Sequence, residues 1–392
     1  MKKSDLVITS AQAFKANFGI PPTHVSSAPG RVNLIGEHTD YNNGYVFPVA
    51  INRRTVIAAS RRNDRKLRIH AHNFNASVEV SLDGLKATKS ESWSNYSKGV
   101  AAVLQENGTK LAGADLLIYS DIPNGVGLSS SAALEMATAY ALLALNSIAM
   151  PPVEVIHSCH NAEFEFVGIH CGIMDQFISC LGKKDHALFL DCESLKYEHV
   201  RVPAGCKLIV CDTGVKRSLA ASEYNIRRQQ CSEGAQQLSY VVPSVRSLRD
   251  ISVKQFEQYK GKLGDVIRKR CRHVIYENER VLQSVAALKR HDLSEFGKLM
   301  YQSHMSLKND YEVSCAELDV VVDICAEVDG VYGARMTGAG FGGAAICLVE
   351  SDQTDEVVTR LRREYPEKTG RRPTIQVCTI EDGAEVMPWT SL

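Results

Sequence analysis

The chain has 392 residues, which is long for one hydrophobic core and suitable for two, because a domain typically holds about 100 to 200 residues. Lys plus Arg and Asp plus Glu both total 45, so no net charge attracts the chain to nucleic acid or to an anionic membrane. We therefore expect two lobes and small-molecule ligands, with no nucleic-acid or membrane partner, and we infer no obligate protein partner.

The N-terminal residues and the cysteines indicate the compartment. Polar residues follow the first apolar triplet too early for a signal peptide, and no later run approaches the roughly 20 apolar residues of a membrane span. The twelve cysteines are scattered, with no Cys-x-x-Cys pair and no matching His-x3-His spacing. We expect a cytoplasmic protein with free thiols and neither a structural metal nor a disulfide framework.

The first half alternates strand-like and helical patterns. Short apolar runs predict strands at 55–60 and 114–120, and longer periodic runs predict helices at 94–105 and 132–146. These patterns are typical of a mixed sheet with helices packed against it.

A polar stretch that contains Pro and Gly, at 200–205, precedes a new apolar strand. We place the lobe boundary there, which gives an N-terminal lobe over 1–204 and a C-terminal lobe over 205–392. The second half combines long amphipathic helices with a few strands, a pattern typical of an α+β lobe. The helices are predicted at 222–239, 266–289, 293–305 and 317–327, and the strands at 207–212, 344–349 and 374–379.

Residues 123–132, Pro-Asn-Gly-Val-Gly-Leu-Ser-Ser-Ser-Ala, lie between a predicted strand and a predicted helix. Glycines allow close backbone approach, and N–H groups at a helix start favour an anion, most simply phosphate. The segment lacks the lysine of the Walker-type loop and the second glycine pair of a dinucleotide fold, which excludes both. The alternative is an ordinary serine-capped helix after a glycine turn.

Two further segments are rich in glycine. Residues 28–41 place Arg, Asn, Glu, His and Asp within eleven positions, which suits a polyhydroxylated ligand, although each residue alone could belong to a solvated loop. Residues 336–343 hold four glycines, and this predicts backbone in close contact with another loop or with a phosphate.

The three segments in this order resemble the GHMP kinase superfamily. Residues 30–41, Gly-Arg-Val-Asn-Leu-Ile-Gly-Glu-His-Thr-Asp-Tyr, match the signature of its galactokinase branch. Further galactokinase-like blocks lie at 171–177, 222–225 and 310–314. The likeness runs from about residue 13 to beyond residue 380.

The resemblance implies an α+β, two-lobed GHMP kinase fold. The N-terminal lobe would be ribosomal-S5-like, the C-terminal lobe ferredoxin-like, and the active site would lie between them. It also implies a cytoplasmic enzyme that transfers the γ-phosphoryl group of ATP to O1 of α-D-galactose, giving galactose 1-phosphate and ADP, the first step of the Leloir pathway.

Site residues follow from the matched motifs. Asp175 matches the family's catalytic aspartate, and Arg31 matches the arginine beside it. A neighbouring guanidinium keeps a carboxylate ionised but also makes it a weak base. Whether Asp175 is a true general base therefore stays open. The residues that would bind the sugar are Arg31, Glu37, His38, Asp40, Gly172, Asp175 and Tyr224. Within this set, the resemblance assigns the distinction between galactose and glucose to Asp40 and Tyr224.

For ATP, the resemblance implies a phosphate loop, an adenine pocket and a Mg²⁺ site. The loop residues would be Gly125, Gly127, Leu128, Ser129, Ser130, Ser131 and Ala132. Trp93 and Tyr96 would line the adenine pocket, although an aromatic pair at this spacing can be plain core. Ser130 and Glu163 would bind Mg²⁺, whereas a helical glutamate is more commonly an exposed surface residue.

The sequence departs from the family pattern at two places. Ala339 stands where a glycine is usual, which affects the close approach expected of the third segment, and Asp212 adds an acidic residue near the expected sugar pocket. The alternatives are a kinase of N-acetylgalactosamine or a related sugar, and a catalytically silent galactose sensor. Intact Asp175, Arg31 and phosphate-loop residues argue against the sensor, and the acidic Glu37 argues against a uronic acid substrate.

Overall fold

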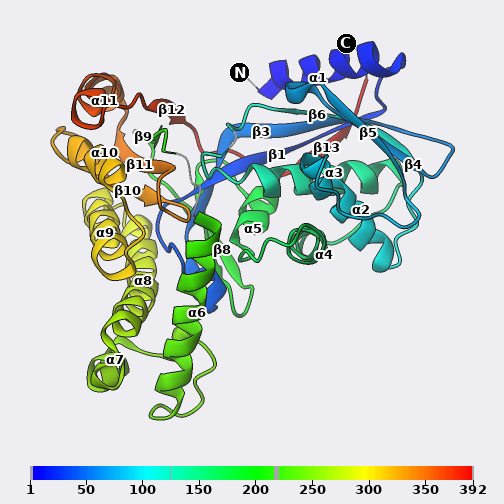
Figure 1. Ribbon diagram of the computed structural model, residues 1–392. Helices are drawn as coiled ribbons and strands as arrows, with labels where there is room; N and C mark the ends of the chain where they lie inside the picture. Colours follow the sequence, from blue (N-terminus) through cyan, green and yellow to red (C-terminus); the bar gives the residue numbers. More distant parts are fainter. Residues whose placement is uncertain (1–2, 124, 216–219, 391–392) are drawn as a thin grey trace.

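The computed structural model describes residues 3–123, 125–215 and 220–390, and it has two lobes (Figure 1). The N-terminal lobe is built on a six-stranded sheet in the order β13-β1-β3-β6-β4-β5. Its strands are β1 (His24–Asn33), β3 (Pro48–Arg61), β4 (Lys66–Ala71), β5 (Ala76–Ser81), β6 (Ala114–Ser120) and β13 (Glu385–Pro388). Neighbouring strands are antiparallel except β4 and β6, which are parallel.

Helices cover both faces of this sheet (Figure 1). The helix α1 (Lys3–Phe18) lies on one face, and four helices lie on the other: α2 (Asn95–Glu106), α3 (Ser130–Leu145), α4 (Pro152–Asn161) and α5 (Met174–Leu181). Alternation along β3 explains the two layers, since successive side chains of a strand point to opposite faces. Val56 and Ala58 pack with Phe14 of α1, whereas Ile57 and Ala59 belong to the core that contains α3.

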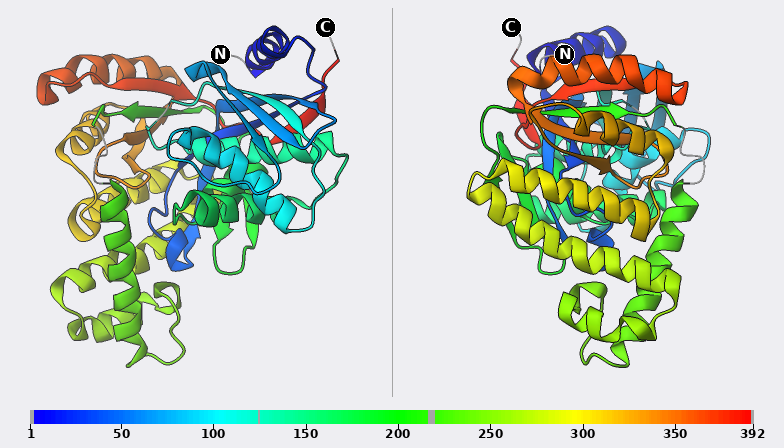
Figure 2. Two further views of the ribbon diagram at one scale, coloured as in Figure 1. Left: turned by 45° about the vertical axis from the view of Figure 1, so that its right-hand side comes forward. Right: turned by 90° about the vertical axis from the view of Figure 1, so that its left-hand side faces the viewer.

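The C-terminal lobe has a four-stranded antiparallel sheet in the order β10-β11-β9-β12. The strands are β9 (Cys206–Asp212), β10 (Val331–Thr337), β11 (Ala344–Glu350) and β12 (Thr374–Cys378). The helices are α6 (Ala220–Ser239), α7 (Val253–Tyr259), α8 (Asp265–Lys289), α9 (Leu293–Ser306), α10 (Ala316–Ala326) and α11 (Thr354–Thr369). Figure 2 shows the sheet between α11 on one side and α8 and α9 on the other, while α6 and α7 extend away from it.

The remaining elements of the two lobes are short. A three-stranded sheet consists of β2 (Tyr45–Val46), β7 (His186–Asp191) and β8 (Tyr197–Arg201). Two π-helical segments continue longer helices: η4 (Ala162–Val167) and η7 (Leu307–Tyr311). Single 3-10 turns are η1 (Asp40–Asn42), η2 (His72–Phe74), η3 (Ser92–Ser94), η5 (Leu248–Asp250), η6 (Lys260–Lys262) and η8 (Ser351–Gln353).

A packed core, not a flexible linker, connects the lobes. On β9, Leu208 and Val210 belong to the same apolar cluster as the N-terminal sheet, whereas Ile209 and Cys211 face the cluster that contains α10 and α11. The sheet of the C-terminal lobe therefore separates two cores, and one of them crosses the lobe boundary.

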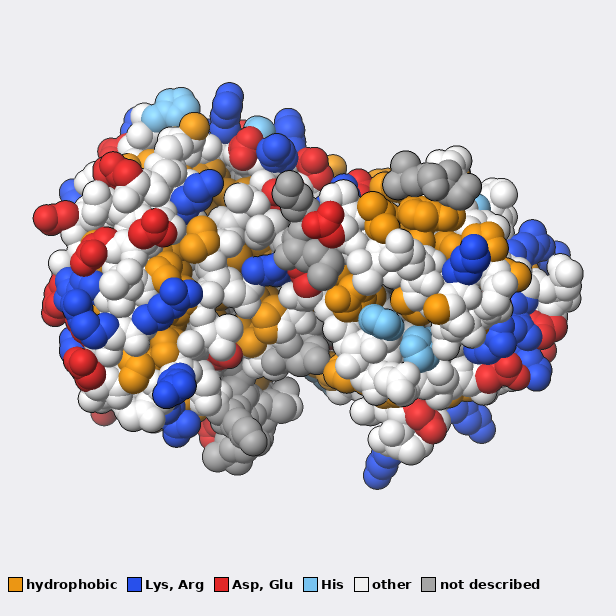
Figure 3. Space-filling model, turned by 90° about the horizontal axis from the view of Figure 1, so that it is seen from above, with side chains coloured by type: hydrophobic (Ala, Val, Ile, Leu, Met, Phe, Trp, Pro, Cys, Tyr) orange, Lys and Arg blue, Asp and Glu red, His pale blue; other side chains and the backbone are white. Residues whose placement is uncertain are grey.

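The charges and thiols agree with the sequence analysis. On the face seen from above, Lys and Arg side chains are interspersed with Asp and Glu, without a region of one sign (Figure 3). All twelve cysteines are free thiols. Within the described ranges, no helix has both the length and the apolar character to span a membrane.

The expected elements correspond closely to observed ones, and β6 begins and ends at the predicted residues. Several elements were not expected, including α1, α7, α11 and the hairpin of β4 and β5. In addition, β13 pairs with β1, so residues 385–388 lie in the N-terminal sheet although the range 205–392 was assigned to the other lobe. The boundary near residue 204 stays a prediction.

Gly297 provides a stability test. A Cβ atom here would overlap the carbonyl oxygen of Tyr332, so α9 can lie on the backbone of β10 only with glycine at this position. We expect Gly297→Ala to lower the free energy of unfolding by about 3 kcal/mol in urea denaturation, because the added methyl must displace packed backbone. The control Gly261→Ala faces open space and should change it by less than about 0.5 kcal/mol. Equal effects of the two substitutions would contradict this account.

Candidate active site

A cavity of about 520 Å³ lies between the lobes. Its volume is within the usual range of roughly 300 to 1,000 Å³ for a small-molecule site. It is lined by Arg31, Glu37, His38, Asp40, Tyr41, Gly168, Ile169, His170, Cys171, Gly172, Met174, Asp175, Tyr224, Asn225, Gly338 and Ala339. All seven residues predicted to bind the sugar are therefore brought together here.

Asp175 and Arg31 form a bidentate ion pair in this cavity. The Nε and Nη2 atoms of Arg31 donate to the two carboxylate oxygens of Asp175, each at 2.7 Å. Burial lowers the pKa of Arg31, but the adjacent Asp175 carboxylate more than offsets this, so the pKa is raised. The hydroxyl of Ser129 also donates to Asp175. Asp175 is thus a firmly oriented carboxylate in the first turn of α5.

An irregularity in β1 directs Arg31 into the site. The pairing of β1 with β3 shifts register between Pro29 and Arg31, as expected of a bulge, and such bulges re-aim side chains. Gly30 allows the phosphate loop to come close, because a Cβ atom there would lie 2.6 Å from the carbonyl oxygen of Leu128. That carbonyl accepts a hydrogen bond of 3.1 Å from the Arg31 amide.

Asp40 approaches the cavity from η1, and Gly172 makes room for it. A Cβ atom on Gly172 would overlap the carboxylate of Asp40. Burial raises the pKa of Asp40 to about 7, and the nearby negative charge of Asp175 contributes in the same direction. The structure therefore gives Gly172, predicted to bind sugar, a steric role: its missing side chain is the space that Asp40 occupies.

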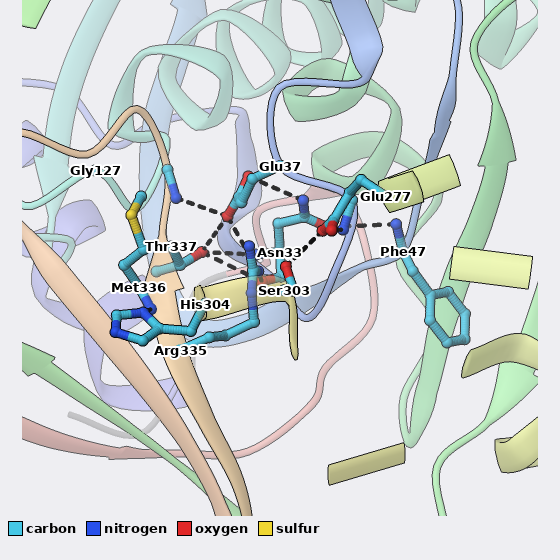
Figure 4. Close-up of polar contacts among 12 residues, drawn as sticks. Asn33, Glu37, Phe47, Gly127, Glu277, Ser303, His304, Arg335, Met336 and Thr337 are labelled. Atoms are coloured by element: carbon cyan, nitrogen blue, oxygen red, sulfur yellow. Dashed lines mark hydrogen bonds and ion pairs between the residues drawn. The ribbon is translucent and has the colours of Figure 1, made fainter. Parts of the chain in front are cut away.

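Glu37 is held by both lobes (Figure 4). Its Oε2 accepts a hydrogen bond from Asn33 of β1, at 3.0 Å. Its Oε1 accepts from the hydroxyl of Thr337 at 2.9 Å and from the amide of Gly338 at 2.7 Å. Arg335, whose side chain is fully buried, lies 3.4 Å from the same oxygen. The wall of the cavity at Glu37 therefore exists only where the lobes meet.

Aromatic side chains surround His38. Its Nδ1 is hydrogen bonded to the hydroxyl of Tyr41 at 2.7 Å, and that hydroxyl is hydrogen bonded to Tyr311 at 2.8 Å. The ring of Tyr224 lies 5.8 Å from the ring of His38. Burial lowers the pKa of His38 well below its usual value, so the ring is neutral. The ring is also hydrogen bonded to the backbone of Ala339, which lines the same cavity.

A second cavity, of about 260 Å³, adjoins the start of α3. Trp93 and Tyr96 line it together with Ser130 and Ser131, as the sequence predicted for a nucleotide. In the loop before α3, Gly125 and Gly127 have φ angles of +76° and +85°, which favour glycine. Asn124, within this loop, lies outside the described residues.

The other loop residues have different surroundings. Leu128 and Ala132 are buried in the core, and their side chains do not reach the second cavity. The hydroxyl of Ser129 contacts Asp175. Ser129 thus connects the loop before α3, next to the second cavity, to the Asp175 carboxylate in the first cavity.

Glu163, predicted to bind metal, is buried on η4 and not exposed as in a surface helix. Its Oε2 accepts from Nε2 of Gln176 at 2.7 Å and from the thiol of Cys171 at 3.1 Å, and it is also hydrogen bonded to the Ser131 side chain. Burial raises the pKa of Glu163. No group of three or more His, Cys, Asp or Glu in the described ranges could hold a metal by itself.

Three family models match the chain. They are the galactokinase galactose-binding signature over residues 12–61, the GHMP kinases N terminal domain over 95–183 and the GHMP kinases C terminal domain over 284–367. A galactokinase of Roseiflexus sp. (strain RS-1) is 45% identical over 95% of each chain, and one of Clostridium acetobutylicum is 42% identical over 97% of this chain and 99% of its own. The chain belongs to the galactokinase family. It is accordingly an ATP-dependent sugar kinase.

Solved structures confirm the GHMP kinase fold that was predicted. Lactococcus lactis galactokinase complexed with galactose has 36% sequence identity and a TM-score of 0.93, covering 96% of this chain and 99% of that one. Methanococcus jannaschii mevalonate kinase, with 19% identity and a TM-score of 0.65 over 91% of this chain and 98% of its own, shares the fold alone. The galactokinase-family architecture thus extends over nearly the whole chain.

The structure also answers what the third segment of this galactokinase-family chain contacts. Its glycines approach other loops: the amide of Gly338 donates to Glu37, and a Cβ atom on Gly340 would overlap the carbonyl oxygen of Val313. Ala339 lines the first cavity, whereas Asp212 is not among the described residues that line it. Sequence reasoning gave no role to Asn33, Arg335 or Thr337. Asn33 lies inside the galactokinase signature, which was a usable signal.

Asp40 predicts a pH dependence of stability. Because its pKa is raised to about 7 in the folded protein, the native state holds a proton that the unfolded state releases above its own pKa. The stabilisation that this bound proton gives the native state is complete below the pKa of Asp40 in the unfolded chain. It is lost as the pH rises through the pKa of Asp40 in the folded protein. Between about pH 5 and pH 8 we expect Asp40 to account for a loss of roughly 2 kcal/mol, which Asp40→Asn should remove in urea denaturation.

The exposed carboxylate of Asp329 supplies the matched substitution, Asp329→Asn, which should leave the pH dependence as in the wild type. If Asp40→Asn has the same pH dependence as the wild type, Asp40 does not titrate in this range.

Proposed function

We propose that the chain transfers the γ-phosphoryl group of Mg-ATP to O1 of α-D-galactose. The observation that carries the proposal is the position of Asp175, which lines the cavity between the lobes and accepts a hydrogen bond from Ser129 of the phosphate loop. A sugar in the first cavity and a triphosphate in the second would meet at this carboxylate. Phosphoryl transfer depends mainly on such alignment and on charge stabilisation.

Asp175 would orient the acceptor hydroxyl. Its two oxygens already accept hydrogen bonds from Arg31, and a carboxylate in a bidentate pair is a weak base. We therefore assign to Asp175 the polarisation of the O1–H bond, with proton transfer late in the reaction. Arg31 fixes the direction of this carboxylate through two hydrogen bonds.

Sugar recognition is assigned to polar groups of the first cavity. His38, Asp40 and Tyr224 line this cavity, and the His38 ring is buried and neutral. A buried hydroxyl without its partner is costly, and a site built on such contacts rejects an epimer. The acidic lining argues against a uronic acid, whereas N-acetylgalactosamine is an alternative substrate.

Ser130 and Glu163 fit a hard divalent cation such as Mg²⁺. Glu163 is a buried carboxylate that forms no ion pair with Lys, Arg or His among the described residues, and hydroxyl and carboxylate oxygens suit Mg²⁺. When bound at Ser130 and Glu163, the cation would supply positive charge that offsets the negative charge of the phosphates. Twelve free thiols are consistent with a reducing compartment, and we propose the cytoplasm.

The test is ADP release from Mg-ATP with galactose, glucose, N-acetylgalactosamine and galacturonate, followed by phosphorus NMR of the product. We expect turnover with galactose and an α-1-phosphate. Asp175→Ala should lower kcat by about 1,000-fold, because the acceptor loses its polarising and orienting group. Asp323→Ala, at an exposed position on α10, is the control and should keep wild-type kcat.

Each other outcome has a definite meaning. Galactose binding without ADP would favour a silent sensor. Preference for another sugar would retain kinase chemistry and overturn galactose as the substrate. Full activity of Asp175→Ala would contradict the role of this carboxylate.

Gly172 tests the sugar site separately. Gly172→Ala places a methyl group against Asp40, so we expect the carboxylate to move and the affinity for galactose to fall by about 10-fold to 100-fold in calorimetry. The affinity for ATP should not change, since Gly172 does not line the second cavity. If the affinities for galactose and for ATP fall equally, the substitution has disturbed the whole fold and not only the position of Asp40.

A further inference from the structure

Two buried oxygen atoms close to the proposed metal site lack hydrogen-bond partners among the described residues. They are Oε1 of Glu135 on α3 and Oε1 of Gln176 on α5. Both side chains are fully buried. An unpaired buried polar atom costs about 1 to 3 kcal/mol, so two of them in adjoining side chains require an explanation.

The orientation of the Gln176 amide is fixed by its neighbours. Its Nε2 donates to Oε2 of Glu163 at 2.7 Å and to Oε2 of Glu135 at 3.0 Å. Both N–H bonds are therefore used. Rotating the amide by 180° would turn its oxygen towards two carboxyl groups, which is unfavourable, so the nitrogen is assigned correctly.

The two oxygens without partners belong to the same two groups that already share one hydrogen bond. An ionised Glu135 could only accept hydrogen bonds, and its Oε1 and that of Gln176 would both stay unsatisfied. A neutral carboxylic acid has one O–H donor. If the proton is on Oε1 of Glu135, this O–H group can donate to Oε1 of Gln176. A single hydrogen bond then gives both oxygen atoms a partner.

We propose that Glu135, as a neutral carboxylic acid, and Gln176 form a cyclic pair with two hydrogen bonds that positions Glu163. One bond runs from the Gln176 amide to Glu135, and the other from the acid to the Gln176 carbonyl oxygen. The remaining N–H of Gln176 holds Glu163. Glu135 and Gln176 are positioning residues, and this inference rests on the proposed role of Glu163 in Mg-ATP binding.

The surroundings favour the neutral acid. Burial raises the pKa of Glu135 well above its usual value, and the negative charges of Glu163 and Asp175 act in the same direction. A carboxyl group kept neutral by an apolar site can serve as a hydrogen-bond donor at neutral pH. Gln176 also adjoins Asp175 in sequence, so one turn of α5 carries both the catalytic carboxylate and the amide that holds Glu163.

Three substitutions separate this pair from a simple packing role. Glu135→Gln retains both hydrogen bonds, because the new amide can donate one hydrogen bond to Gln176 and accept one from it, as the neutral acid does. Glu135→Leu and Gln176→Met remove the pair. Thr138→Val is the control, since Thr138 is a buried polar residue one turn further along α3 whose hydroxyl contacts Ser97 and the Leu134 carbonyl.

The measurement is Mn²⁺ binding in the presence of a non-hydrolysable ATP analogue, followed by electron paramagnetic resonance. We expect Glu135→Leu and Gln176→Met to weaken it by about 10-fold to 100-fold, as for other groups that orient a metal ligand. Glu135→Gln and Thr138→Val should bind as the wild type does, and galactose affinity should be unchanged in all four. If Glu135→Gln weakens binding as strongly as Glu135→Leu, or if neither changes it, the proposal is wrong.

Infrared spectroscopy of the ligand-free protein gives a second readout that needs neither metal nor turnover. With ¹³C-labelled glutamate, the wild type should show the C=O band of a protonated acid, and Glu135→Gln should lack it. Absence of this band from the wild type overturns the proposal even if Glu135→Leu fails to fold. Loss of galactose phosphorylation by the wild type would instead refute the proposed function and leave the infrared result standing.

Discussion

The constraint on which this site depends is the burial of like charge. Three carboxyl groups, those of Glu37, Asp40 and Asp175, line the cavity between the lobes, and the negative charge of Asp175 acts on two more buried carboxyl groups, those of Glu135 and Glu163. Burying them together is unfavourable unless each negative charge is paired, hydrogen bonded or removed. Each carboxyl group meets this requirement differently, and the differences define their functions.

Asp175 is paired with Arg31 through two hydrogen bonds, which hold it in one orientation. Glu37 is almost fully buried and has four donors around it, so it is a rigid wall. Asp40 shares its space with Asp175 and is close to its titration point at neutral pH. A site in which neighbouring carboxyl groups are held in different states can bind a neutral sugar and a highly charged nucleotide side by side.

Much of this was predictable from the sequence. The expected strand and helix on either side of the phosphate loop correspond to β6 and α3, and the predicted sugar-binding residues line one cavity. Motifs identify such residues because the required chemistry restricts which side chains can occupy them.

What the sequence did not reveal depends on partners that are distant in the chain. Glu37 and Gly338 are about 300 positions apart, so no local pattern links them. Gln176 lies inside a galactokinase-like block and Glu135 in a predicted helix, but neither position indicates that the two buried side chains meet. Gly172 acts through the side chain that it lacks, which composition cannot indicate. The strand β13 is short, and its pairing with β1 is a tertiary contact.

That pairing has a consequence for synthesis of the chain on the ribosome. β1 is made near the beginning and β13 near the end, yet they are neighbours in one sheet. Until β13 emerges, the outer edge of β1 presents unpaired backbone groups, and an open strand edge is a template for association with other chains. We therefore expect the open edge of β1 to favour association of the nascent N-terminal lobe with other chains until β13 has been made.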